Sequence, residues 1–205
     1  PSLTTVAIYD NAALKEVTWG DKTTIYSLDI HGNQLAAFDL SGFTGLHWLN
    51  LSNFTSWGKT LDVSGMRELE GLDLTGSSFE TLVAHQTPNL GYNYDWQVKK
   101  VDFSNKGWEG GWYAIEGPTE WDEEKEQYVN AYCPLETLIL SGSNELGYLE
   151  VRNFKNLKSV DVSGCEVLEH LNVYENDALT SIDLKENPSL TTVAIYDNAA
   201  LKEVT

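Results

Sequence analysis

The sequence predicts an all-β repeat solenoid, and three observations carry the prediction. Leucine recurs every eleven residues in the carboxy-terminal third, at positions 135, 146, 157, 168, 179, 190 and 201. Each eleven-residue unit has aliphatic residues at its first, fourth and sixth places and a turn-forming residue near its ninth. The first eighteen residues, PSLTTVAIYDNAALKEVT, return unchanged as residues 188–205, an offset of 187. Long internal periods of this kind are typical of repeat architectures.

The fourth and sixth places of each unit predict one short strand. Pairs such as Leu171 with Val173, or Ile182 with Leu184, alternate with polar residues, which is the pattern of a half-buried strand. The Gly, Asn and Asp residues that follow favour a tight turn. Successive units alternate between a form like LxxLDLSG and a form like LxxVxIYxN. The predicted coil is therefore about 22 residues long, with a short strand on each of two sides. No helical periodicity of useful length appears.

The ninth place of the unit predicts what fills the turn. An inward-pointing Asn there can bond the backbone of its own and adjacent coils. We therefore expect a structural ladder built from Asn11, Asn176, Asn187 and Asn198. Where the ninth residue is apolar, the inside of the turn is expected to be apolar too, as at Phe43, Phe54, Met66, Phe154 and Cys165.

The pattern continues through the amino-terminal half with slips and two breaks. Residues 90–97 (LGYNYDWQ) are expected as a loop, and residues 107–134 as one inserted aromatic and acidic segment on the flank. Fourteen unit starts, or seven coils, are counted from Leu3 to Leu190. At about 4.8 Å per coil, one 187-residue cassette would advance about 34 Å. Because neither end carries a polar cap, we expect residues 1–205 to be one continuous, uncapped solenoid within a longer array.

The motif LxxLxLxxN, with its nested spacing of ten to eleven residues, resembles the IRREKO-type leucine-rich repeats of bacterial surface and secreted proteins, those of Bacteroidota especially. The resemblance covers nearly all of the chain outside residues 90–97 and 107–134. The chain departs from the pattern at Gly58, where an aliphatic first residue is missing. The resemblance implies a solenoid, an extracellular or cell-surface location, and a role in binding or display. It transfers no catalytic residue.

Charge and composition exclude several function classes. The net charge of −18, spread over the predicted rise, comes to one charge per about 2 Å, close to the linear density of double-stranded DNA. Nucleic acid is therefore excluded as a partner, whereas counterions, weakly held divalent cations among them, are expected to gather on the rod. No His or Cys residues have metal-ligand spacing, and no acid–base set converges. We expect no metal site, no cofactor, no enzyme activity and no membrane span.

The insertion is the one long segment that departs from the repeat and is rich in aromatic residues. Its aromatic residues, with one from the preceding loop, form a candidate binding surface: Trp96, Trp108, Trp112, Tyr113, Trp121 and Tyr128. Three interpretations stay open, namely packing of the insertion onto the solenoid, contact with another chain, and stacking on a glycan. Its acidic run, residues 120–126, is expected to be a solvated loop or helix turn.

A second aromatic group is expected on one outer face. The seventh place of same-side units holds Tyr9, Arg152, Tyr174 and Tyr196. Side chains at equivalent places on neighbouring strands lie next to one another, so these residues are expected to stack as a column. The column serves either stability or lateral association between rods.

Two functions follow. The first is a structural repeat module of a long extracellular or cell-surface protein, continuing head to tail as a fibre or stalk, with itself as partner. The alternative is a surface adhesin module that binds a glycan or a surface protein through the aromatic insertion. The first function requires the cassette to continue on both sides, whereas a lone adhesin domain requires caps instead.

Overall fold

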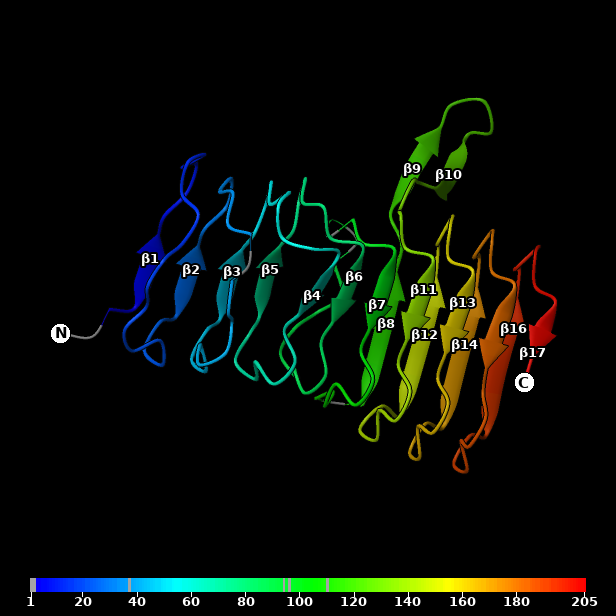
Figure 1. Ribbon diagram of the computed structural model, residues 1–205. Coiled ribbons are helices and arrows are strands. Elements are labelled where there is room, and N and C mark those ends of the chain that lie inside the picture. Colours follow the sequence, from blue (N-terminus) through cyan, green and yellow to red (C-terminus); the bar gives the residue numbers. More distant parts are fainter. Residues whose placement is uncertain (1–2, 37, 94, 96, 110) are drawn as a thin grey trace. The chain divides into compact units, whose positions relative to one another are not determined.

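The computed structural model describes residues 3–36, 38–93, 95, 97–109 and 111–205. These residues form short strands joined by turns and loops, with no α-helix among them (Figure 1). They divide into two compact units, residues 1–98 and residues 99–205. Each unit is a β-solenoid, as its strand pairing shows.

In the first unit, parallel strands from successive coils form two sheets. One sheet has the order β1 (Thr5–Ala7), β2 (Ser27–Asp29), β3 (Trp48–Asn50) and β5 (Gly71–Asp73). Thr5 pairs with Ser27, Ser27 with Trp48, and Trp48 with Gly71, so one coil takes 21 to 23 residues. On the other side, β4 (Thr60–Asp62) pairs in parallel with β6 (Thr81–Val83).

The second unit repeats this arrangement with a stricter period. One sheet contains β7 (Lys100–Asp102), β11 (Thr137–Ile139), β13 (Ser159–Asp161), β15 (Ser181–Asp183) and β17 (Glu203–Val204). The other contains β8 (Trp112–Glu116), β12 (Tyr148–Arg152), β14 (His170–Tyr174) and β16 (Thr192–Tyr196). Ser159 pairs with Ser181, and His170 with Thr192, so the coil is 22 residues long. The predicted coil length and the strand on each of two sides are confirmed.

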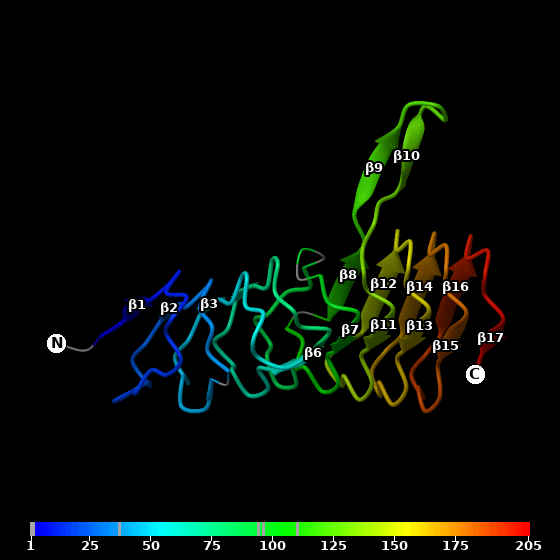
Figure 2. The same cartoon turned by 45° about the horizontal axis from the view of Figure 1, so that its top comes forward.

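The segment that leaves the coil is shorter than residues 107–134. Trp112 to Glu116 form β8, which pairs in register with β12 and is therefore a strand of the solenoid. Beyond it, β9 (Thr119–Asp122) and β10 (Gln127–Asn130) form an antiparallel hairpin. This hairpin stands away from the coils of the second unit (Figures 1 and 2). The acidic run 120–126 lies in β9 and in the hairpin turn, not in a helix.

The count of seven coils per cassette is wrong because two units hide in the breaks of the pattern. Leu90 is buried, and its N–H donates to Thr87 O (3.2 Å), as the first leucine of other units bonds the ninth residue of the unit before. Strand β8 belongs to a further unit. About sixteen units, or about eight coils, therefore separate Leu3 from Leu190, and a continuous stack of them would advance about 38 Å.

Local chemistry explains the turns, and alternation explains the core. In the D-x-S-G turns the Asp carboxylate caps the backbone, as where Ser163 N donates to Asp161 Oδ1 (2.9 Å), and Gly164 then takes a left-handed φ of 67°. The aliphatic side chains at the fourth and sixth places of interior coils, such as Leu171 and Val173, are fully buried. Among the described residues there is no helix of the length and apolar character that a membrane span requires.

Candidate functional site

Asn176 shows how an interior coil uses the ninth place of its unit. Its side chain is buried, and its Oδ1 accepts a hydrogen bond from Phe154 N (3.2 Å) on the preceding coil. Its Nδ2 donates to Val151 O (3.1 Å) on that coil and to Tyr174 O (2.9 Å) on its own. Its own N–H donates to Asn198 Oδ1 (3.2 Å) on the following coil. The side chain of Asn176 thus satisfies backbone groups of two successive coils, and the side chain of Asn198 links it to the third, as a ladder requires.

The other ladder residues make subsets of the same bonds. Asn187 Oδ1 accepts from Cys165 N (2.9 Å), and its Nδ2 donates to Leu184 O (2.7 Å). In the first unit, Asn11 N donates to the Oδ1 of the buried Asn33 (3.0 Å). Asn33 was missed as a ladder residue, although it stands at the ninth place of the unit that begins at Ile25 and the same spacing would have found it.

The two identical segments form equivalent parts of two different coils, one in each unit. Asn11 and Asn198 are equivalent residues, 187 positions apart. Asn11 bonds forward, its N–H donating to Asn33 on the following coil. Asn198 bonds backward, its Oδ1 accepting from Asn176 N (3.2 Å) and its Nδ2 donating to Val173 O (2.8 Å). Together, Asn11 and Asn198 make the kinds of bond that the single residue Asn176 makes with the coil before it and the coil after it.

The equivalent tyrosines, Tyr9 and Tyr196, likewise contact neighbouring coils in opposite directions. Tyr9 stacks on His31 of the following coil, with ring centroids 4.7 Å apart and an interplanar angle of 11°. Its copy, Tyr196, stacks on Tyr174 of the preceding coil at 4.7 Å and 7°. Burial also differs between the copies three residues earlier, where Val6 is 8% exposed and its copy Val193 is 44% exposed.

The remaining ninth places hold other buried side chains, among them Thr87, Ser143, Cys165 and a lysine, Lys106. Cys165 Sγ lies 3.3 Å from Leu140 O, and burial raises the pKa of its thiol to about 11. Lys106 Nζ lies 4.4 Å from the centre of the Trp108 ring and 5.6 Å from that of Phe103. Burial lowers the pKa of Lys106 to about 8, with the charge of Glu109 acting in the opposite direction.

Trp108 belongs to the core and not to a binding surface. Its side chain is 3% exposed, and its Nε1 donates to Ser143 Oγ (3.1 Å). Its ring meets Phe103 edge-on at 5.7 Å and Tyr113 at 4.3 Å. Indoles with a satisfied N–H are well suited to burial. The beginning of the predicted insertion is thus held in place by packing. Tyr113 is half-buried and packs with Trp108 and Phe103 in one aromatic cluster.

The exposed aromatic residues of the predicted binding surface form two groups. Trp112 lies on the outer face of β8, stacked on Tyr148 at 5.6 Å. Trp121 and Tyr128 face each other across the hairpin, 5.3 Å apart and edge-on, and both side chains are more than half exposed. The hairpin is tied to the solenoid where Asn130 Nδ2 donates to Glu175 O (2.7 Å). Trp96 lies outside the described residues.

The exposure of the hairpin aromatics predicts that they contribute little to folding. We expect the double substitution Trp121→Ala/Tyr128→Ala to change the free energy of unfolding by less than about 1 kcal/mol, because these side chains already contact water. Urea unfolding followed by circular dichroism measures this change. A loss of about 3 kcal/mol or more would show that these rings act as a satellite core.

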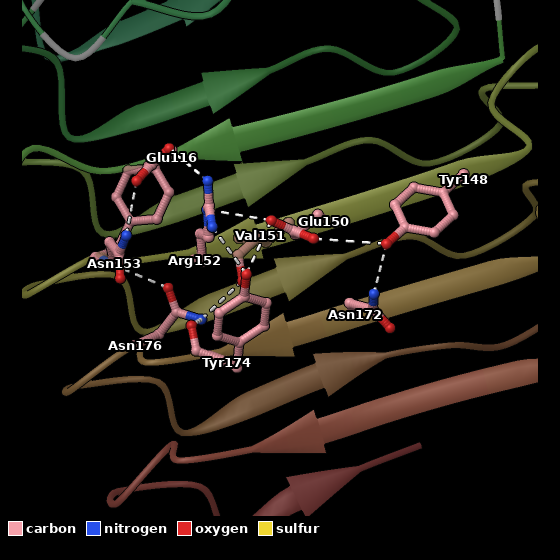
Figure 3. Close-up of polar contacts among 10 residues, drawn as sticks. Glu116, Tyr148, Glu150, Val151, Arg152, Asn153, Asn172, Tyr174 and Asn176 are labelled. Atoms are coloured by element: carbon pink, nitrogen blue, oxygen red, sulfur yellow. Dashed lines mark hydrogen bonds and ion pairs between the residues drawn. The ribbon is translucent and has the colours of Figure 1, made fainter.

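A charged network covers the outer face of β8, β12 and β14 (Figure 3). Arg152 Nη2 donates to Glu116 Oε2 (2.9 Å), and its Nη1 donates to Tyr174 OH (3.0 Å). Its Nε lies 3.1 Å from Glu150 Oε1, a contact that is an ion pair without hydrogen-bond geometry. Tyr174 OH in turn donates to Glu150 Oε1 (2.9 Å). Three of the four residues of the expected column, Arg152, Tyr174 and Tyr196, are in contact, each with the next. The fourth, Tyr9, lies in the first unit and stacks on His31 instead.

Among the described residues, no group of three His, Cys, Asp or Glu side chains is placed to hold a metal ion. The chain matches no family model and no curated protein. Its surfaces must therefore be interpreted from the geometry alone.

Proposed function

We propose that this chain is a structural repeat module of a longer extracellular or cell-surface protein, in which 187-residue cassettes continue head to tail as a fibre or stalk. The observation that carries the proposal is the exact return of residues 1–18 as residues 188–205, because the two copies form equivalent strands of the coil, β1 and β16. Each copy bonds the neighbouring coil that it has, and each of these bonds has its counterpart at the interior Asn176. Merged into a single coil, the two copies would have both neighbours that a solenoid coil needs.

Three further features support a rod. Parallel strands of successive coils continue the backbone hydrogen bonds along the axis, so that stacking removes exposed sheet ends. The exposed Val193 would become covered by a following coil, as Val6 is. The dense negative charge keeps such rods soluble and attracts divalent counterions. The extracellular location is supported by the resemblance to leucine-rich repeats of bacterial surface proteins.

A tandem protein tests the continuation. Residues 1–187 would be joined three times in succession and followed by residues 188–205, and small-angle X-ray scattering would be compared with that of the 205-residue chain. We expect a single rod whose length grows by a constant increment of about 38 Å for each added cassette, because the merged coil leaves no break in the stack. Flexibly connected particles, without a constant increment, would contradict the proposal.

The exposed hairpin supports a second candidate, an adhesin module. Trp121 and Tyr128 present large aromatic surfaces on a hairpin that stands away from the coils of the second unit (Figure 2). Exposed aromatics of this kind are enriched where proteins bind partners. An array would repeat the hairpin once per cassette and so gain avidity. The two functions are compatible, since the first concerns the coils and the second concerns what they display.

A further inference from the structure

The first unit carries a pocket on the outer face of its four-stranded sheet. The pocket has a volume of about 500 Å³ and lies over β2, β3 and β5. This volume is within the range of small-molecule sites. The pocket is lined by one large aromatic side chain, by a row of planar polar side chains and by part of segment 90–97: Trp48, Asp29, Asn50, Asp73, Glu70 and Tyr92.

Trp48 forms a flat platform on the sheet. Its indole lies over Gly71 on the neighbouring strand, so close that a Cβ atom at Gly71 would come 1.9 Å from the ring. The glycine therefore allows the ring to lie against the sheet, and the Trp48 side chain remains 50% exposed. A large ring with one face held by backbone and the other open to solvent is a stacking surface.

A row of planar polar side chains runs beside the platform. Asp29, Asn50 and Asp73 occupy equivalent positions on β2, β3 and β5 and pair in register. Each uses its Oδ1 to cap the turn that follows, as where Thr75 N donates to Asp73 Oδ1 (2.9 Å). This capping fixes the side chains and leaves the second polar atom of Asp73 without a hydrogen bond among the described residues. Neighbouring members are separated by about 4.8 Å, the distance between strands.

Residues 91–93, which belong to the break in the repeat pattern, line one side of the pocket. A further strand beside β5 would cover Gly71 and Asp73, but residues 91–93 form no strand. Instead Tyr92 and Asn93 line one side of the pocket, and Glu70 lines it from the coil of β5. Residues 91–93 therefore border the pocket at a place where a further regular strand would have extended the flat sheet.

We propose that this pocket binds a neutral saccharide, with the apolar C–H face of a pyranose ring on Trp48 and its hydroxyl groups hydrogen-bonded to Asp29, Asn50 and Asp73. A ring with one apolar face and equatorial hydroxyl groups matches a flat aromatic surface bordered by carboxylates and an amide. Asp29 and Glu70 contact His31 and His47, at 2.6 Å and 3.1 Å, whereas Asp73 makes no ion pair among the described residues. The negative charge of Asp73 disfavours sialic and uronic acids. This site is separate from the coil continuation proposed above and does not depend on it.

An array of immobilised glycans tests the proposal on the 205-residue chain. The array would carry neutral oligosaccharides of glucose, galactose, mannose and N-acetylglucosamine beside sialylated and uronic acid glycans. We expect binding to neutral glycans alone. With the strongest neutral oligosaccharide as probe, calorimetry should show at least a tenfold loss of affinity for Trp48→Ala and for Gly71→Ala, which lifts the ring without removing it. The control variant Trp121→Ala should bind as the unchanged chain does.

Three results would overturn the proposal. These are the absence of binding to any neutral glycan, a preference for acidic glycans, and loss of binding in Trp121→Ala with retention in Trp48→Ala. The last result would place the glycan on the hairpin instead. Circular dichroism and urea midpoints show whether each variant is folded, and Gly71→Ala keeps the indole as a second, independent perturbation of the platform. None of these results bears on the tandem protein, so the two proposals fail separately.

Discussion

Asn176→Leu is expected to lower the free energy of unfolding by about 3 to 5 kcal/mol. Leucine has a similar size but accepts and donates no hydrogen bond. The substitution therefore leaves Phe154 N, Val151 O and Tyr174 O without their partner in a buried turn. Each buried backbone group left unsatisfied costs about 1 to 3 kcal/mol. Equilibrium unfolding in urea, monitored by far-ultraviolet circular dichroism, measures the loss.

Asn144→Leu is the matched control. Asn144 is exposed, and its Oδ1 accepts one long bond from Glu166 N (3.3 Å). Because water can replace this bond, the expected loss is below about 1 kcal/mol. Equal losses in the two variants would contradict the ladder as the source of stability, and so would a loss below 1 kcal/mol in Asn176→Leu.

Lys106→Met is expected to stabilise the chain at pH 7 by about 1 to 3 kcal/mol. Lys106 is buried, so the folded chain carries a desolvated charge at this pH. Methionine has a similar length and no charge. The contact of the ammonium with the Trp108 ring, 4.4 Å from its centre, offsets part of the desolvation cost and is lost in the variant.

The pH dependence gives the sharper test of Lys106. Its folded pKa of about 8 lies below its ordinary value of 10.5. Below pH 8 the amine is protonated in both states. Between pH 8 and 10.5 the unfolded chain binds more protons than the folded chain, so stability rises with pH. The unchanged chain should therefore gain about 2 to 3 kcal/mol over this range relative to Lys106→Met.

The measurement is a comparison of urea unfolding at pH 7 and pH 10 for both proteins, since other groups titrate equally in each. Lys155→Met, which removes an exposed lysine, is the control and should show the pH dependence of the unchanged chain. If Lys106→Met retained that pH dependence, Lys106 would not be the group that titrates.

The regular repeat was predictable from the sequence, whereas the units at Leu90 and at β8 were not. The eleven-residue leucine period predicted the coil length, the two sides and the register of β12, β14 and β16, because each unit carries its own strand and turn signals. The same rule, applied to the amino-terminal half, would have found Asn33. It failed at β8, whose aromatic sequence WYAIE lacks the leucine pattern although it pairs with β12.

The candidate surfaces depended more on three-dimensional contacts. Composition grouped Trp108 with Trp112, Trp121 and Tyr128, but the structure buries the first and exposes the other three. No sequence signal separates them, because burial depends on which coil lies beside each residue. The Trp48 pocket was missed for the same reason. It combines residues from β2, β3 and β5 with a loop some twenty residues farther along the chain.

The repeating strand-and-turn coil and the identity of the two eighteen-residue segments are predictable from the sequence, because both are properties of local order along the chain. The contact of Lys106 with Trp108, the burial of Trp108 and the position of residues 91–93 beside a pocket are not, and they depend on how the coils stack. The physical reason is that stacking brings together residues about 22 positions apart, where side-chain size and hydrogen bonding between coils, not local propensity, set the arrangement.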